Sequence, residues 1–100
     1  MNILLVGDHL NLPGYEVVET CNIQFPANVV GCRDIIEGLL YPEDISRRYP
    51  IVFQAIPGQV AVAISRILVQ WEYRATMGMW SDTMRPIIGI VSNGSKIEWF

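Results

Sequence analysis

The sequence contains one histidine, one lysine and two cysteines, and each of these small numbers excludes a class of protein. A zinc site needs several His or Cys ligands, and Cys21 and Cys32 lack the CxxC spacing of a metal or redox pair. We therefore predict no metal site and no cofactor, with both cysteines as small buried side chains. One lysine and six arginines in a chain of net charge −3 form no broad basic face, which argues against duplex DNA as a partner.

Long apolar runs are also missing. No run approaches the roughly 18 apolar residues of a membrane span, and Met1 leads straight into a strand-like segment without a basic leader. We therefore expect no membrane partner and a cytoplasmic location. The length of 100 residues suits one domain, which we expect to span residues 1–100.

Charge is scarce, because only 17% of the residues are charged, whereas 51% are hydrophobic and the mean hydropathy is +0.30. A small protein has a large surface relative to its volume, so part of this apolar material is expected to meet a second subunit. We predict a homodimer, with contacts from the loop around Trp80 and from the C-terminal residues Ile97, Trp99 and Phe100.

The central stretch combines a strand pattern with a helix pattern. Ile51 to Ile56 is a short, mostly apolar run that suits a strand buried on both faces of a parallel sheet. Pro57-Gly58 predicts a tight turn, and from Val60 the apolar residues recur at spacings of three and four, which predicts a helix. Free backbone N–H groups at such a turn favour an anion, often a phosphate. A structural turn without a ligand explains these residues equally well.

Other segments complete an α/β pattern. Strands are predicted for Asn2 to Gly7, Glu16 to Phe25, Ile87 to Ser92 and Lys96 to Phe100, and a helix is predicted behind an N-cap at Asn28. The link between His9 and Glu16 is shorter than a normal parallel crossover, so the second strand either follows an abbreviated crossover or runs antiparallel. Asn93-Gly94 lies between the last two strands and predicts a hairpin turn.

These elements predict a Rossmann-like α/β fold: a mostly parallel sheet of about five strands, helices on its faces and a C-terminal antiparallel hairpin strand. Open α/β sheets bind ligands at the carboxyl ends of their strands. We therefore expect one site that contains Gly7, Asp8, His9, Gln24, Pro57, Gly58, Gln59 and Ser92. Asp8 serves equally well as a turn or cap residue, and His9 as an exposed loop side chain. GxGxxG does not follow the first strand, which argues against NAD or FAD.

Three short motifs carry a family resemblance: VGDHL at residues 6–10, NIQF at 22–25 and PIVFQAIPGQVAVA at 50–63. They resemble the small CRISPR-associated Rossmann-fold proteins that are linked to cyclic oligoadenylate signalling in type III systems. The resemblance implies a homodimer that binds a cyclic oligoadenylate, such as cyclic tetra-adenylate, in a site shared by the two subunits. It also implies metal-independent cleavage, as in ring nucleases. That family has a helix after its first strand, and this sequence lacks one between His9 and Glu16.

Cleavage of RNA without a metal requires a ribose 2′-OH held in line with its own phosphorus and donors for the developing charge. The backbone N–H groups of Gly58 and Gln59 can act as those donors. His9 is the expected general acid or base, because histidine is the side chain that ordinarily titrates near neutrality. A non-catalytic module that binds or sequesters the messenger fits the composition as well as an enzyme does. A receiver-like phosphoacceptor domain fits poorly, since Asp8 stands alone without an acidic partner.

Overall fold

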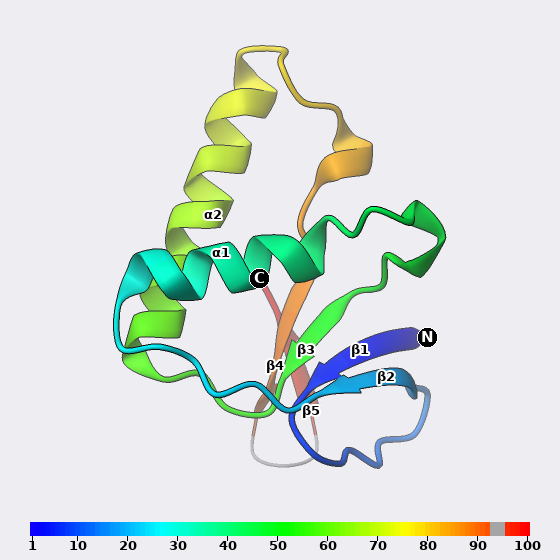
Figure 1. The fold of residues 1–100 in the computed structure, drawn as a ribbon. Helices are drawn as coiled ribbons and strands as arrows, with labels where there is room; N and C mark the ends of the chain where they lie inside the picture. The colour runs from blue at the N-terminus through cyan, green and yellow to red at the C-terminus, as the bar shows by residue number, and fades with distance from the viewer. Residues whose placement is uncertain (93–95) are drawn as a thin grey trace.

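The computed structural model describes residues 1–92 and 96–100, whose five strands form one sheet in the order β2-β1-β3-β4-β5 (Figure 1). The strands are β1 (Asn2–Val6), β2 (Glu16–Cys21), β3 (Ile51–Phe53), β4 (Ile88–Ser92) and β5 (Lys96–Trp99). The first four run parallel, and β5 runs antiparallel to β4. The predicted fold class is therefore confirmed. The turn predicted at Asn93-Gly94 lies outside the described residues.

Two strands end several residues earlier than their sequence patterns predicted, whereas β1 and β5 each end one residue early, at Val6 and Trp99. Val6, the last residue of β1, is in register with Cys21 of β2 and Phe53 of β3. A strand continues only as far as a neighbour offers backbone partners, so β2 ends at Cys21 rather than at Phe25, and β3 ends at Phe53 rather than at Ile56. The residues that follow these two strands are thereby released from the sheet to form loops at its carboxyl edge.

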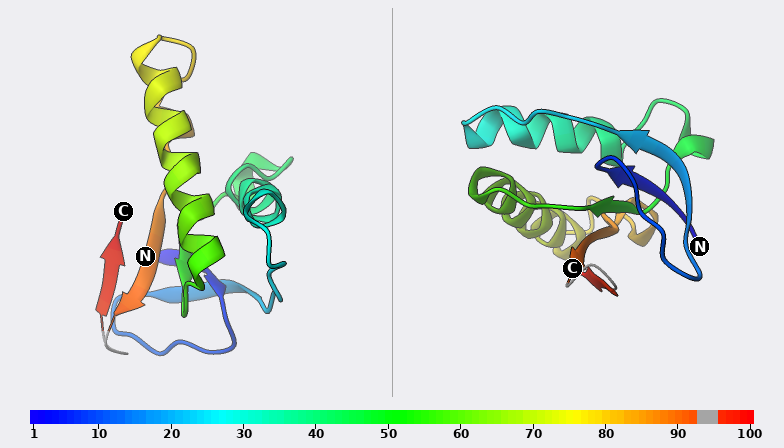
Figure 2. Two further views of the ribbon diagram at one scale, coloured as in Figure 1. Left: turned by 90° about the vertical axis from the view of Figure 1, so that its left-hand side faces the viewer. Right: turned by 90° about the horizontal axis from the view of Figure 1, so that it is seen from below.

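The helices α1 (Val29–Leu40) and α2 (Gly58–Thr76) lie on the same face of the sheet (Figures 1 and 2). As predicted, α1 begins behind Asn28, whose side chain accepts a hydrogen bond from Gly31 N at 2.6 Å. The sequence predicted a tight turn at Pro57-Gly58. This prediction is wrong for Gly58, which is the first residue of α2. Among the described residues, no helix is both long and apolar enough to cross a membrane.

One core fills the space between the helices and the sheet. The buried sheet residues are Leu4, Val6, Ile51, Phe53 and Ile88, and the buried helix residues are Cys32, Ile36, Leu40, Val60, Ala63, Ile64 and Ile67. The helix residues recur at spacings of three and four, so each helix presents one apolar stripe to the sheet. This packing fixes the start of α2 at the carboxyl end of β3.

The opposite face of the sheet is covered by a loop instead of a helix. Residues 7–15 connect β1 to β2, and Leu10, Leu12 and Tyr15 of this loop pack on the second core cluster. That cluster consists of Ile3, Leu5, Val52 and Ile97. The second strand is therefore parallel and reached by an abbreviated crossover, which decides between the two alternatives left by the sequence.

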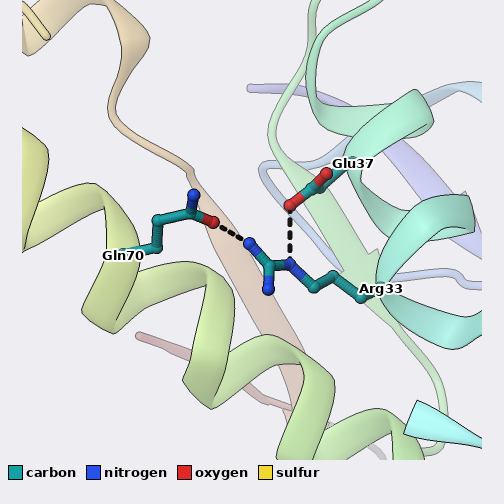
Figure 3. A network of polar contacts seen from close by, with 3 residues as sticks. All are labelled: Arg33, Glu37 and Gln70. Atoms are coloured by element: carbon teal, nitrogen blue, oxygen red, sulfur yellow. Dashed lines mark hydrogen bonds and ion pairs between the residues drawn. The ribbon is translucent and has the colours of Figure 1, made fainter. Parts of the chain in front are cut away.

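An arginine joins the two helices. Arg33 Nε donates to Glu37 Oε1 at 2.9 Å within α1, and its Nη2 donates to Gln70 Oε1 of α2 (Figure 3). The side chain is partly buried, so these hydrogen bonds are only partly weakened by water. Arg33 therefore helps to fix the position of α2, and with it the residues at the start of that helix.

Candidate functional site

A cleft of about 390 Å³ opens at the carboxyl ends of β1 and β3, beside the segment that follows β2 and the start of α2. Its lining residues are Val6, Gly7, Asn22, Ile23, Gln24, Phe25, Gln54, Ala55, Pro57 and Gln59. Four of the predicted site residues, Gly7, Gln24, Pro57 and Gln59, are thus brought together. The location agrees with the rule that open α/β sheets bind ligands at the carboxyl ends of their strands.

A larger groove of about 710 Å³ lies on the outer surface of the helices, between Arg33 and Tyr73. It is lined mainly by Ala61, Val62 and Val69 with the stems of longer side chains, and it is shallow. A ligand site generally combines an apolar wall with several polar groups that converge on one ligand. The smaller cleft has that arrangement, because four amide side chains line it.

Gln54 is the structural centre of the cleft. Its Oε1 accepts a hydrogen bond from Asp8 N at 2.8 Å, and its Nε2 donates to the carbonyl oxygen of His9. A Cβ atom at Gly7 would overlap the Gln54 side chain, so only glycine lets Gln54 lie against the backbone here. Sequence analysis did not select Gln54. The available signal was a single polar residue within the otherwise apolar run Ile51 to Ile56.

Asp8 borders the cleft and joins two loops. Asn22 Nδ2 donates to Asp8 Oδ1 at 2.7 Å, which links the end of β1 to the segment after β2. Asp8 itself is exposed. This hydrogen bond supports the interpretation of Asp8 as a residue that stabilises the loop. The Asp8 carboxylate also lies beside the cleft, because its partner Asn22 is a lining residue.

The start of α2 supplies backbone donors. The carbonyl oxygen of Pro57 accepts from both Val60 N and Ala61 N at 3.0 Å, which are the first bonds of the helix. The N–H groups of Gly58 and Gln59 precede these bonds and have no partner within the helix. The first turn carries no acidic residue, so the positive end of the helix dipole is not neutralised there. Gln59 Nε2 donates to the Pro26 carbonyl at 3.4 Å, which anchors the Gln59 side chain.

Besides Asp8, three predicted site residues lie outside the lining of the cleft: His9, Gly58 and Ser92. His9 is exposed in the loop after β1, and the structure holds its carbonyl group rather than its ring. Gly58 is exposed between the lining residues Pro57 and Gln59. Ser92 ends β4 and pairs with Lys96 of β5. The sheet order therefore brings Ser92 to the same edge without placing it in the cleft.

The lining combines apolar residues with four uncharged amide side chains. Among the described residues that form it, none carries a formal charge or titrates near neutrality. Within residues 1–92 and 96–100, no group of three or more His, Cys, Asp and Glu side chains could hold a metal ion. The arrangement can donate and accept hydrogen bonds along the edge of a heterocyclic ring, since each amide carries a donor and an acceptor side by side.

Comparison with protein-family models, with curated proteins and with solved structures gives no match. The family resemblance therefore depends on the three short motifs of the sequence. Although they are separate in the chain, the motifs contribute Gly7, Gln24 and Gln59 to the same cleft.

Proposed function

We propose that this chain binds a cyclic oligoadenylate through an adenylate unit held in the amide-lined cleft. The observation that carries this proposal is the convergence of the Asn22, Gln24 and Gln59 side chains from two chain segments on one cleft at the start of α2. Asn and Gln recognise adenine in a bidentate manner, by accepting from the N6 amino group and donating to N7. Gln24 is the side chain best suited to this role, because it is exposed and its amide bonds to no other described residue.

The phosphate of the same unit is expected at the start of α2. The N–H groups of Gly58 and Gln59 and the helix dipole favour one negative charge. No arginine or lysine lines the cleft among the described residues, so a diester with one charge per nucleotide suits it better than a triphosphate does. A volume of about 390 Å³ is near the lower end of typical ligand pockets. The cleft therefore suits one nucleotide of a ring.

The proposal includes cleavage of the ring, with His9 as the residue that transfers a proton. A ring that is larger than the cleft extends over its rim, where Asp8 and His9 follow β1. His9 would then act as general acid or base at the 2′-OH or at the leaving oxygen. Binding without cleavage is the second candidate, and one observation favours it: no described lining residue can itself transfer a proton near neutral pH.

Isothermal titration calorimetry with cyclic tetra-adenylate tests the binding step. The parent chain is expected to bind the ring, and Gln24→Ala is expected to weaken binding by about tenfold or more, because one bidentate base contact is lost. Asn11→Ala is the matched control, since Asn11 is an exposed amide in the loop on the other face. A cyclic tetra-uridylate should bind more weakly than the adenylate ring.

Two results would contradict the proposal. One is an absence of binding by the parent chain, and the other is equal affinity for the adenylate and uridylate rings. Chromatography of the same mixtures after incubation separates the two candidates, because an enzyme produces linear fragments whereas a sequestering protein returns the ring intact.

A further inference from the structure

Among the strands that the structure describes, β5 lies at one end of the sheet and has a neighbouring strand on one side only. Figure 2 shows it at the outer margin of the molecule in both views. Phe100 N donates to Ile88 O at 2.9 Å, and β5 continues this ladder along β4. Hydrogen-bonded pairs alternate in antiparallel sheets, so the backbone groups of Lys96 and Glu98 face β4. The N–H and C=O groups of Ile97 and Trp99 therefore point outward, away from the sheet.

The side chains of β5 separate by face. Lys96 and Glu98 are exposed on one face, and Ile97 and Trp99 lie on the other. Ile97 is buried in the cluster beneath the loop of residues 7–15. Trp99 stays 39% exposed although its ring lies 6.4 Å from that of Tyr15. An exposed tryptophan beside unpaired backbone groups is typical of a surface that accepts another strand.

We propose that β5 pairs in antiparallel fashion with β5 of a second copy of this chain, with the two-fold axis at Ile97. The outward N–H and C=O groups of Ile97 then bond to those of the partner's Ile97. In this register Lys96 lies directly opposite the partner's Glu98, and the same pair occurs twice by symmetry. Trp99 reaches diagonally across the partner's Ile97, which covers apolar surface of both residues.

Charge distinguishes this register from the neighbouring ones. An axis at Glu98 would place two glutamates opposite each other, which is unfavourable. An axis at Trp99 would place Glu98 opposite the partner's Phe100 and leave the charge unpaired. An edge lysine ordinarily discourages strand pairing, but with the axis at Ile97 the chain's only lysine meets a carboxylate.

The other edge of the sheet is less suited to a second copy. The edge strand β2 carries Glu16 and Glu19, and its pairing with β1 is interrupted by a register shift between Ile3 and Leu4. Such a bulge bends a strand and disturbs the row of free backbone groups. Self-pairing through β2 would also bring carboxylates together with no cation on the strand.

Pairing through β5 has a consequence for the candidate cleft. The two-fold axis is perpendicular to the joined sheet, so the parallel strands of the two copies point in opposite directions. The clefts at their carboxyl ends then lie at opposite margins, and each copy binds its own ligand. This geometry differs from the shared site that the family resemblance implies. The dimer needs no ligand and goes beyond the proposed function.

Sedimentation velocity on the full chain without ligand tests the inference. The parent is expected to show a mass near twice 11.3 kDa. Lys96→Glu and Glu98→Lys each replace two attractive pairs by two repulsive ones, so each should raise the dissociation constant of the dimer by about tenfold or more. An equimolar mixture of the two variants should restore the dimer, because every glutamate then faces a lysine. The doubly exchanged chain should restore it as well.

Glu16→Lys is the matched control for Glu98→Lys, since it makes the same change of net charge on the other edge strand and should leave the dimer unchanged. Circular dichroism confirms that each variant is folded. A monomeric parent chain, open polymers, or a mixture that associates no better than its components would overturn the inference. A Glu16→Lys variant that no longer forms the dimer would also overturn the inference. None of these results bears on nucleotide binding, which a monomer can show by calorimetry.

Discussion

Gln54 Oε1 accepts a hydrogen bond from Asp8 N at 2.8 Å, although the two residues are 46 positions apart in the chain. The second half of the Gln54 amide donates to the carbonyl of His9. One side chain at the end of β3 therefore holds the loop that follows β1. The wall of the cleft and the position of His9 both depend on this contact.

Replacement of this side chain should loosen the loop. Gln54→Ala removes two hydrogen bonds, so the free energy of unfolding should fall by about 1–2 kcal/mol. Urea denaturation measures the loss. Gln24→Ala is the control in the same cleft, and because its amide supports no backbone contact it should change stability by less than about 0.5 kcal/mol. Equal losses in the two variants would show that the Gln54 contacts do not stabilise the loop.

The glycine beside Gln54 should be equally sensitive. In Gly7→Ala, the new methyl group overlaps the Gln54 amide and displaces it from Asp8 and His9. We expect a loss of stability of about 1–3 kcal/mol. Gln54→Ala removes the overlapping atoms, so the double variant should lose clearly less than the sum of the two single losses. If the two losses of stability add, Gly7→Ala does not act through the Gln54 side chain.

Gly58 should tolerate a small side chain. A Cβ atom there meets nothing within 4 Å, and the residue is the first of α2. Gly58→Ala should therefore leave thermal stability unchanged or raise the free energy of unfolding by up to about 1 kcal/mol. A decrease in ligand affinity in this folded variant would place the phosphate near the first turn of α2. An unchanged affinity would place the phosphate away from this residue.

The two cysteines should react at different rates. Burial raises the pKa of the Cys21 thiol above its ordinary value, and the negative charge of Glu19 raises it further. Less thiolate is then present at neutral pH, so iodoacetamide should alkylate Cys21 more slowly than an ordinary cysteine, with the rate increasing as pH rises. Cys32 is buried in the core and should react only on unfolding. Mass spectrometry of the labelled chain, with a urea-unfolded control, measures both rates.

His9 distinguishes an enzyme from a binding protein. If the ring is cleaved by general acid–base catalysis, His9→Ala should slow single-turnover cleavage by about two to four orders of magnitude with little change in affinity. Because the backbone carbonyl of His9, rather than its ring, is held by Gln54, the loop should keep its conformation in this variant. An unchanged cleavage rate would remove His9 from the chemistry. Product analysis at saturating ring concentration gives the rate.

Sequence patterns were sufficient for the elements and for part of the site. Apolar runs and spacings of three and four predicted all five strands and both helices, because alternation and helical periodicity are local properties of the chain. The rule for carboxyl ends in parallel sheets then placed Gly7, Gln24, Pro57 and Gln59 together. That rule needs only the order and direction of the strands.

The remaining features depend on which segments meet in space. The sequence left the direction of β2 open because the link of residues 7–15 is short, and only its packing over Ile3 and Leu5 made a parallel crossover without a helix possible. The ends of β2 and β3 were set by the end of their common neighbour β1. Gln54 acquired its role from a contact with Asp8, which no local pattern records. Periodicity reports the burial of one segment, whereas such contacts arise from the packing of segments far apart in the chain, and only the tertiary structure decides them.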